Sequence, residues 1–292
     1  MYDLHTHTTR SDSTLSLAEL IGEARVAGLH GLAVCDHDTL IGVPDLISAK
    51  QEWSSGEAGA SLHETSPGSA ELVIIPGLEV SSIAPDQETR VHVLVYGSHL
   101  ISPESALAKL MNKTIEARNE IAFYNVTRME RDGLDITWDR VKQIAGNSAC
   151  VYKQHIAEAL SGKTYGHPDY QRVYRAYVSS GCPYACQVAY PDACEVVEAA
   201  AKTQAVVVLA HPGQSRNFHF APALVEAGLQ GIELNHPDHN EDDRVLVQQL
   251  ASQYGLLMTG GSDYHGANSP TRSIGCCVAS HEGFEEIIHR VG

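Results

Sequence analysis

The chain has 292 residues, sixteen of them histidine, and a net charge of −16 when the histidines are neutral. This acidic balance argues against a protein that binds long nucleic acids, because such proteins cluster lysine and arginine against the phosphate backbone. No apolar run is long enough to cross a bilayer, and the first residues show neither the basic nor the apolar region of a secretory signal, so we expect a cytoplasmic protein with no membrane contact.

Short β-rich runs alternate with helical patterns over most of the chain. Such alternation predicts βα units around a parallel sheet, and the length leaves room for one barrel of such units or for two smaller domains. The first helix is expected after Ser16, because Ser16 and Glu19 have the form of a capping box and Gly28 can end the helix. Asp192 and Glu195 repeat this form before a later helix. The predicted strands cover residues 2–5, 31–35, 72–75, 91–96, 205–209, 231–234 and 256–259.

Two stretches interrupt the alternation. Residues 54–70 are rich in Gly, Ser, Ala and Glu without periodicity, which indicates a surface loop. Residues 102–190 have helical patterns throughout, including one long amphipathic helix. We therefore expect residues 1–101 and 191–292 to form an α/β barrel, and residues 102–190 to form a helical insertion that caps it.

Histidines and carboxylates gather where the predicted strands end. His5 and His7 lie at the end of the first strand, and the strand period of two aims both imidazoles to the same side. Asp12 follows in a turn. Each signal is weak alone, since a pair of this kind can arise by chance among sixteen histidines, and Asp12 can be a solvated loop residue or a helix cap.

The second and third strands are followed by similar groups. His37 lies between Asp36 and Asp38, and a carboxylate beside an imidazole can fix the tautomer of a ligating histidine. The alternative is that Asp36 and Asp38 only open the next helix. Glu79 takes the equivalent place after the third strand, where it could bridge two cations or form a surface salt bridge.

Later strands add the remaining members of the set. His92 lies inside an apolar strand, where an imidazole is costly unless it is paired or bound, although a lone histidine of this kind is more often a paired core residue. His211 follows the fifth strand, and Asp263 and His265 follow the last. Because the carboxyl ends of parallel strands form the face where barrel active sites assemble, we expect one metal centre there. The predicted ligands are His5, His7, Asp12, His37, Glu79, His92, His211, Asp263 and His265.

The chemistry of these side chains indicates the kind of metal. They supply nitrogen and carboxylate oxygen but no thiolate, which suits Zn, Mn or Fe better than Ca. Nine ligands exceed the number that one ion uses. We expect two to three divalent ions that share a bridging carboxylate.

Five motifs follow one another along the chain: His5-Thr6-His7-Thr8 with Ser11-Asp12, Asp36-His37-Asp38, Pro76-Gly77-Leu78-Glu79, Ala210-His211-Pro212-Gly213 and Gly261-Ser262-Asp263-Tyr264-His265. Together they resemble the PHP (polymerase and histidinol phosphatase) family. The likeness is greatest to its stand-alone phosphoesterases, which include nucleoside 3′,5′-bisphosphate phosphatases and 5′-to-3′ exonucleases that act on short RNA. The resemblance implies a distorted (β/α)7 barrel with a trinuclear metal site and an inserted helical subdomain that helps to form the substrate pocket.

The resemblance also implies how the ligands are divided. One ion would be held by His5, His7, Glu79 and Asp263, a second by Glu79, His92 and His211, and the third by Asp12, His37 and His265. His265, His211 and Asp263 are expected to act in catalysis as well, and either histidine could relay a proton to the leaving alkoxide.

The reaction implied is hydrolysis of a phosphate ester on a small nucleotide-like substrate, such as a nucleoside 3′,5′-bisphosphate, by attack of a metal-bridging hydroxide. The acidic chain favours a small molecule over a long strand, but a cyclic phosphodiester or a short oligonucleotide stays open. A metal-dependent amidohydrolase is a rival that would leave the third ligand group without a role. A non-catalytic PHP module is another, and such modules usually lack ligands.

Four further residues are expected to bind substrate. Arg216 follows the fifth strand and suits phosphate by its bidentate fork, although it could also be a surface loop residue. Lys153 and His155 could reach the substrate from the insertion. His239 follows the sixth strand and could line the pocket or be an ordinary loop histidine.

Overall fold

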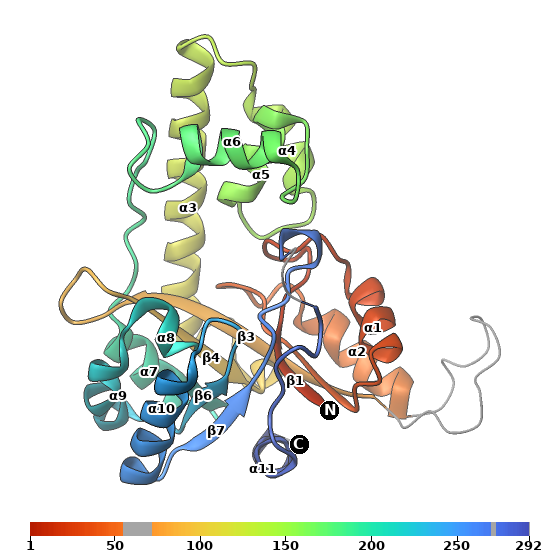
Figure 1. Cartoon of the computed structure of the whole chain (residues 1–292), viewed down its shortest axis with the longest axis vertical. Helices are drawn as coiled ribbons and strands as arrows, with labels where there is room; N and C mark the ends of the chain where they lie inside the picture. The colour runs from red at the N-terminus through yellow and green to blue at the C-terminus, as the bar shows by residue number, and fades with distance from the viewer. Residues whose placement is uncertain (55–71, 270–272, 292) are drawn as a thin grey trace.

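Seven strands form one sheet that curves into a nearly closed barrel (Figure 1). The computed structural model describes residues 1–54, 72–269 and 273–291. The strands follow chain order in the sheet, and the last returns to the first, where the backbone N–H of His7 donates to the carbonyl of Tyr264 at 3.0 Å. The predicted distorted (β/α)7 barrel is thereby confirmed. The strands are β1 (Tyr2–Thr6), β2 (Gly31–Val34), β3 (Val73–Ile83), β4 (Arg90–Tyr96), β5 (Val206–Leu209), β6 (Gly231–Asn235) and β7 (Leu257–Gly260).

The fourth strand departs from the predicted parallel sheet, because β4 runs antiparallel to both β3 and β5. β3 does not stop at Ile75 but continues to Ile83, and only residues 84–89 connect it to β4. A parallel crossover needs about a dozen residues or more, so this short connection permits only a hairpin. Two expectations are therefore wrong: Glu79 lies inside a strand and not after one, and His92 lies near the amino end of its strand.

Helices pack around the outside of the barrel. α1 (Leu17–Val26) begins with the predicted capping box, since Ser16 accepts the N–H of Glu19 while the Glu19 carboxylate accepts the N–H of Ser16. Asp192 caps α7 (Ala193–Ala201) by accepting two backbone N–H groups of its first turn. The other helices around the barrel are α2 (Val43–Ser54), α8 (Pro212–Ser215), α9 (Ala221–Ala227), α10 (Glu241–Tyr254) and α11 (His281–Val291), with short 3₁₀ turns at Ser98–Leu100, Phe218–Phe220 and Gly266–Asn268.

Between β4 and α7 the chain forms a helical unit that stands over one end of the barrel (Figure 1). The first turns of its long helix bury Leu107 and Met111 in the barrel core. Farther along, Val126 and Met129 of the same helix pack into a separate apolar cluster with Tyr170. The helices of this unit are α3 (Ala106–Arg131), α4 (Trp138–Ala145), α5 (Lys153–Ser161) and α6 (Pro168–Val173), followed by a π-helical turn (Tyr174–Val178).

The surface loop predicted over residues 54–70 lies outside the described residues, apart from residue 54 itself. Within the described ranges, no helix combines the length and the apolar character that crossing a membrane requires.

Candidate metal centre

The carboxylate of Glu79 lies at the centre of the site, fully buried in the middle of β3. Burial alone would raise the pKa of this carboxyl, but the surrounding histidines, His37 foremost, hold it well below the usual range. Each oxygen faces a different set of imidazoles. Oε1 lies 2.7 Å from His92 Nδ1 and 2.9 Å from His211 Nε2, and Oε2 lies 3.1 Å from His5 Nε2, 3.3 Å from His7 Nε2 and 3.3 Å from His37 Nδ1. The two oxygens of this carboxylate therefore face two different groups of imidazole nitrogens.

Within the part of the chain that the structure describes, three sets of side chains place possible ligand atoms within 4.8 Å of one another. The first is His5, His7, Glu79 and Asp263, the second is His7, Asp12, His37 and His265, and the third is His37, Glu79 and His92. His211 adjoins them through its contact with Glu79. The structure therefore brings all the predicted ligands together. Their grouping differs from the one that the resemblance implies, because His7 also belongs to the second set and His37 to the third.

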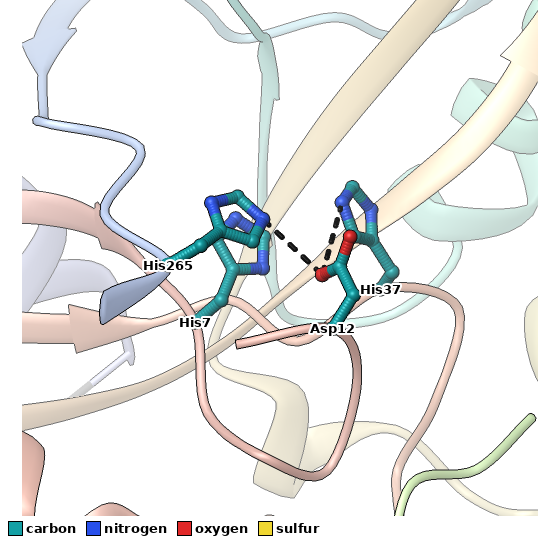
Figure 2. A group of neighbouring side chains, drawn as sticks. All are labelled: His7, Asp12, His37 and His265. Atoms are coloured by element: carbon teal, nitrogen blue, oxygen red, sulfur yellow. Dashed lines mark ion pairs between the residues drawn. The ribbon is translucent and has the colours of Figure 1, made fainter. Parts of the chain in front are cut away.

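Figure 2 shows the second set, in which Asp12 lies beside His7 of its own loop and beside His37 and His265 of two other loops. Asp12 Oδ1 lies 3.2 Å from Nε2 of His265 and 3.9 Å from Nε2 of His37. Nδ1 of His265 donates to the backbone carbonyl of Asp263 at 2.9 Å. This bond holds a proton on Nδ1, so Nε2, which faces Asp12, is the ring nitrogen that can bind a metal.

Several buried atoms of the centre make no hydrogen bond, although polar atoms lie close to them. They include both ring nitrogens of His7, Oδ1 of Asp12 and Nδ1 of His37. An unsatisfied buried polar group costs about 1–3 kcal/mol, and native proteins bury few of them. Cations would satisfy these lone pairs, and nitrogen with carboxylate oxygen suits Zn²⁺, Mn²⁺ or Fe²⁺. The residues present therefore fit divalent metal ions.

Glu233 on β6 is a residue that the sequence reasoning did not identify. Its side chain is fully buried, with Oε1 3.2 Å from Nδ1 of His5 and Oε2 accepting the backbone N–H of His211 at 2.8 Å. A carboxylate behind a ligating imidazole fixes the orientation of the ring. The sequence did hold a signal, since a glutamate inside the apolar run 231–234 is as costly as His92 in its own strand unless it is paired.

Replacing Glu233 by Gln should weaken metal binding about 10- to 100-fold, the usual cost of losing an outer hydrogen-bond partner of a ligand. Metal bound at a series of free-metal concentrations, counted by plasma mass spectrometry, measures the effect. Glu226→Gln changes an exposed glutamate on α9 and should bind metal as the wild-type protein does. Equal affinity in Glu233→Gln and Glu226→Gln would show that His5 needs no such partner.

Asp36 and Asp38 flank His37 but bond to other groups. Asp36 accepts the N–H and the hydroxyl of Thr8 at 2.8 and 2.6 Å. Asp38 accepts the N–H of Ser81 at 2.8 Å. Neither of the two roles considered for them is found, because they tie loops to the barrel and do not orient the His37 ring or begin α2.

A cavity of about 580 Å³ lies beside the metal centre, between the barrel and the helical insertion. The guanidinium carbon of Arg90 lies 3.8 Å from the centre of the Tyr190 ring, and that of Arg118 lies 5.3 Å from it. Partial burial and the neighbouring Arg90 lower the pKa of Lys153. The sequence reasoning predicted neither arginine. Arg118 has the pattern of an ordinary polar residue on an amphipathic helix. The wall includes Asp12, His37 and His92 and the three cationic side chains Arg90, Arg118 and Lys153.

The other three residues predicted to bind substrate do not line this cavity. Arg216 pairs with Asp243, and its side chain is 68% exposed. Nδ1 of His155 accepts a backbone N–H at 3.1 Å and caps α5. Both ring nitrogens of His239 bond to backbone groups, at 2.8 and 3.1 Å. Because each is held by a structural contact, the geometry gives no support to their predicted role.

Comparison with protein families matches residues 3–206 to the PHP domain. The chain belongs to the PHP domain family. The matched region contains the helical insertion and nearly all of strands β1 to β4, and it ends at the first residue of β5. Membership confirms the resemblance drawn from the motifs.

Named relatives cover most of the PHP chain. Phosphoribosyl 1,2-cyclic phosphate 1,2-diphosphodiesterase of Eggerthella lenta is 33% identical over 264 residues, which are 90% of this chain and 94% of that protein. The 3′,5′-nucleoside bisphosphate phosphatase of Chromobacterium violaceum is 28% identical over 94% of this chain and 90% of its own. A crystal structure from Bifidobacterium adolescentis, provisionally described as a metal-dependent phosphoesterase, is 28% identical and has a TM-score of 0.82 over 99% of this chain and 96% of its own. The predicted class is confirmed: the PHP chain is a metal-dependent phosphoesterase, a hydrolase of phosphate esters.

Proposed function

We propose that this phosphoesterase hydrolyses a phosphorylated ribose compound that carries a second phosphate group. The cavity beside the metal centre carries the proposal. Its volume of about 580 Å³ falls within the roughly 300–1,000 Å³ usual for small-molecule sites. Three cationic side chains face the same space as the metal-site residues, so one phosphate can lie at the metals while another is held by positive charge.

The second phosphate is assigned to Arg90, Arg118 and Lys153. Arginine suits phosphate because its planar fork can donate two parallel hydrogen bonds. Nη2 of Arg118 already donates to Asp38 and Ser81, but its Nε has no hydrogen-bond partner. The names of the Eggerthella lenta and Chromobacterium violaceum relatives both describe a ribose with two phosphate groups, which supports the assignment.

The three sets of ligands are proposed to hold one Zn, Mn or Fe ion each, with Glu79 shared between two of them. When bound, such ions lower the pKa of a water molecule and neutralise charge on the phosphoryl oxygens. The protein orients the ligands, as Glu233 does for His5. We assign Asp263 and His265 a catalytic part as ligands of these sets, and His211 a part as a further ligand beside Glu79, whose Oε1 it contacts. A proton relay by His265 is not proposed, because its Nδ1 bonds to a backbone carbonyl and its Nε2 faces Asp12.

A panel of substrates tests this function. Hydrolysis of phosphoribosyl 1,2-cyclic phosphate and of a nucleoside 3′,5′-bisphosphate should exceed hydrolysis of a nucleoside monophosphate or a short oligonucleotide in kcat/KM. Products are to be separated by chromatography, because hydrolysis of one ester bond of a cyclic diester or of an oligonucleotide releases no free phosphate. Chelation of metal should abolish all hydrolysis, and Mn²⁺ or Zn²⁺ should restore it. A preference for the oligonucleotide, or for the monophosphate, would contradict the proposal. Activity that survives chelation would contradict the metal mechanism itself.

Arg90→Met should lower kcat/KM for the two-phosphate substrates about 10- to 100-fold, because a charge-assisted hydrogen bond is worth about 1.5–3 kcal/mol. Hydrolysis of the monophosphate should change little. Arg131→Met is the matched control, since that arginine lies at the far end of α3 and pairs with Asp132. An equal loss of kcat/KM for the two-phosphate substrates and for the monophosphate would mean that Arg90 does not bind the second phosphate.

A further inference from the structure

The helical insertion bonds to the loops that carry Asp12 and His37, two of the ligands of the metal centre. Three consecutive residues of the first loop each receive one bond from the insertion. The bonds run from the Ala149 N–H to the Arg10 carbonyl at 3.0 Å, from the Ser148 hydroxyl to the Ser11 carbonyl at 2.6 Å, from Gln154 Nε2 to Asp12 Oδ2 at 2.9 Å, and from the Tyr152 hydroxyl to the His37 carbonyl at 3.2 Å.

The bond from Gln154 determines how the Asp12 carboxylate is turned. Oδ2 accepts the amide N–H of Gln154, while Oδ1 makes no hydrogen bond and faces Nε2 of His265 and Nε2 of His37. Asp12 is only 5% exposed, so water has little access to its oxygens. Without the hydrogen bond from Gln154, the Asp12 carboxylate would be free to rotate about χ2, a torsion with a broad range of favoured angles.

Three other ligands, His5, His211 and Asp263, have outer partners that belong to the barrel. Glu233 on β6 supports His5 and the backbone of His211. His236, which follows the same strand, lies 3.5 Å from Asp263. The insertion, by contrast, reaches a carboxylate of the three ligand sets directly, through the side chain of Gln154.

We infer that Gln154 is a positioning residue that sets the affinity of one cation, the one held by the set His7, Asp12, His37 and His265. The insertion then controls loading of this cation and leaves the other two to the barrel. The inference rests on the proposed function in one respect, the assignment of one ion to each set. It assigns the second residue of α5 a task separate from that of Lys153, which lies in the cavity wall.

Titration of the metal-free protein with Mn²⁺ tests the inference, with bound metal counted by plasma mass spectrometry after equilibrium dialysis. The variant is Gln154→Met, which keeps the length of the side chain but removes the N–H donor. Two equivalents should bind as in the wild-type protein, and the dissociation constant of the third should rise about 10- to 100-fold. The melting temperature of the metal-free variant should match that of the wild-type protein.

Gln214→Met is the matched control, because Gln214 Nε2 also donates to an aspartate at 2.9 Å, but to Asp238, which belongs to none of the three sets. It should leave all three equivalents unchanged. In an Asp12→Ala background, Gln154→Met should change metal binding no further, since the two residues act as one unit.

Each contrary result has a separate meaning. Three unchanged equivalents in Gln154→Met, or an equal loss from all three, would overturn the positioning role. A wild-type protein that binds fewer than three equivalents would instead overturn the assignment of one ion to each set.

Discussion

Glu79→Gln is expected to abolish phosphate release and to remove most of the bound metal in the same preparation. The reason is the position of the carboxylate, whose oxygens lie within 3.3 Å of nitrogen atoms from five histidines. An amide offers one neutral oxygen in place of two charged ones, and its NH₂ group would face nitrogen lone pairs. Loss of metal-assisted stabilisation worth several kcal/mol corresponds to a fall in kcat of at least about 1,000-fold.

Bound metal and phosphate release should be measured on the same protein after exhaustive dialysis. Glu88→Gln supplies the control, because Glu88 is an exposed residue of the turn between β3 and β4 and should leave both quantities unchanged. Circular dichroism of each variant separates loss of metal from loss of fold. A Glu79→Gln enzyme that keeps its metal and its activity would show that this carboxylate is not the bridge.

The barrel could be predicted from the sequence because its strands are apolar and short and because capping residues such as Ser16 and Asp192 mark where helices begin. The direction of β4 could not be predicted by the same reasoning. Alternation of strands and helices favours parallel neighbours, and the extension of β3 to Ile83 carries Glu79 and Ser81 inside a strand where a loop was expected. The antiparallel direction of β4 follows from the short connection between β3 and β4. The length of that connection is known only once the end of β3 is known.

The ligand set could be predicted because imidazoles and carboxylates stand out against apolar strands. Its grouping could not, since His7 and His37 each belong to two sets and only their positions in space show this. The residues that bind substrate were harder still to predict from the sequence. Arg118 pairs with Asp38, a residue far from it in the sequence. Arg216 has the side chain expected of a phosphate ligand, but it pairs with Asp243.

Arg118→Met is expected to destabilise the metal-free protein by about 3–5 kcal/mol, the cost of leaving one member of a buried ion pair without the other. Asp38 is fully buried, and its Oδ2 accepts Nη2 of Arg118 at 3.1 Å. The same nitrogen donates to the hydroxyl of Ser81 at 2.8 Å. Burial raises the pKa of the Asp38 carboxyl and the arginine opposes this, so the charge of Asp38 depends on its partner.

Calorimetry of the metal-free variants separates this effect from metal binding. Asp38→Asn combined with Arg118→Met should recover part of the loss, because the double variant no longer buries an unpaired charge. Arg131→Met breaks an exposed pair with Asp132 and should cost no more than about 1 kcal/mol. If Arg118→Met and Arg131→Met had the same melting temperature, the ion pair between α3 and the His37 loop would not fasten the insertion to the barrel. A large loss that the double variant partly reverses would show that this pair holds the insertion in place over the metal centre.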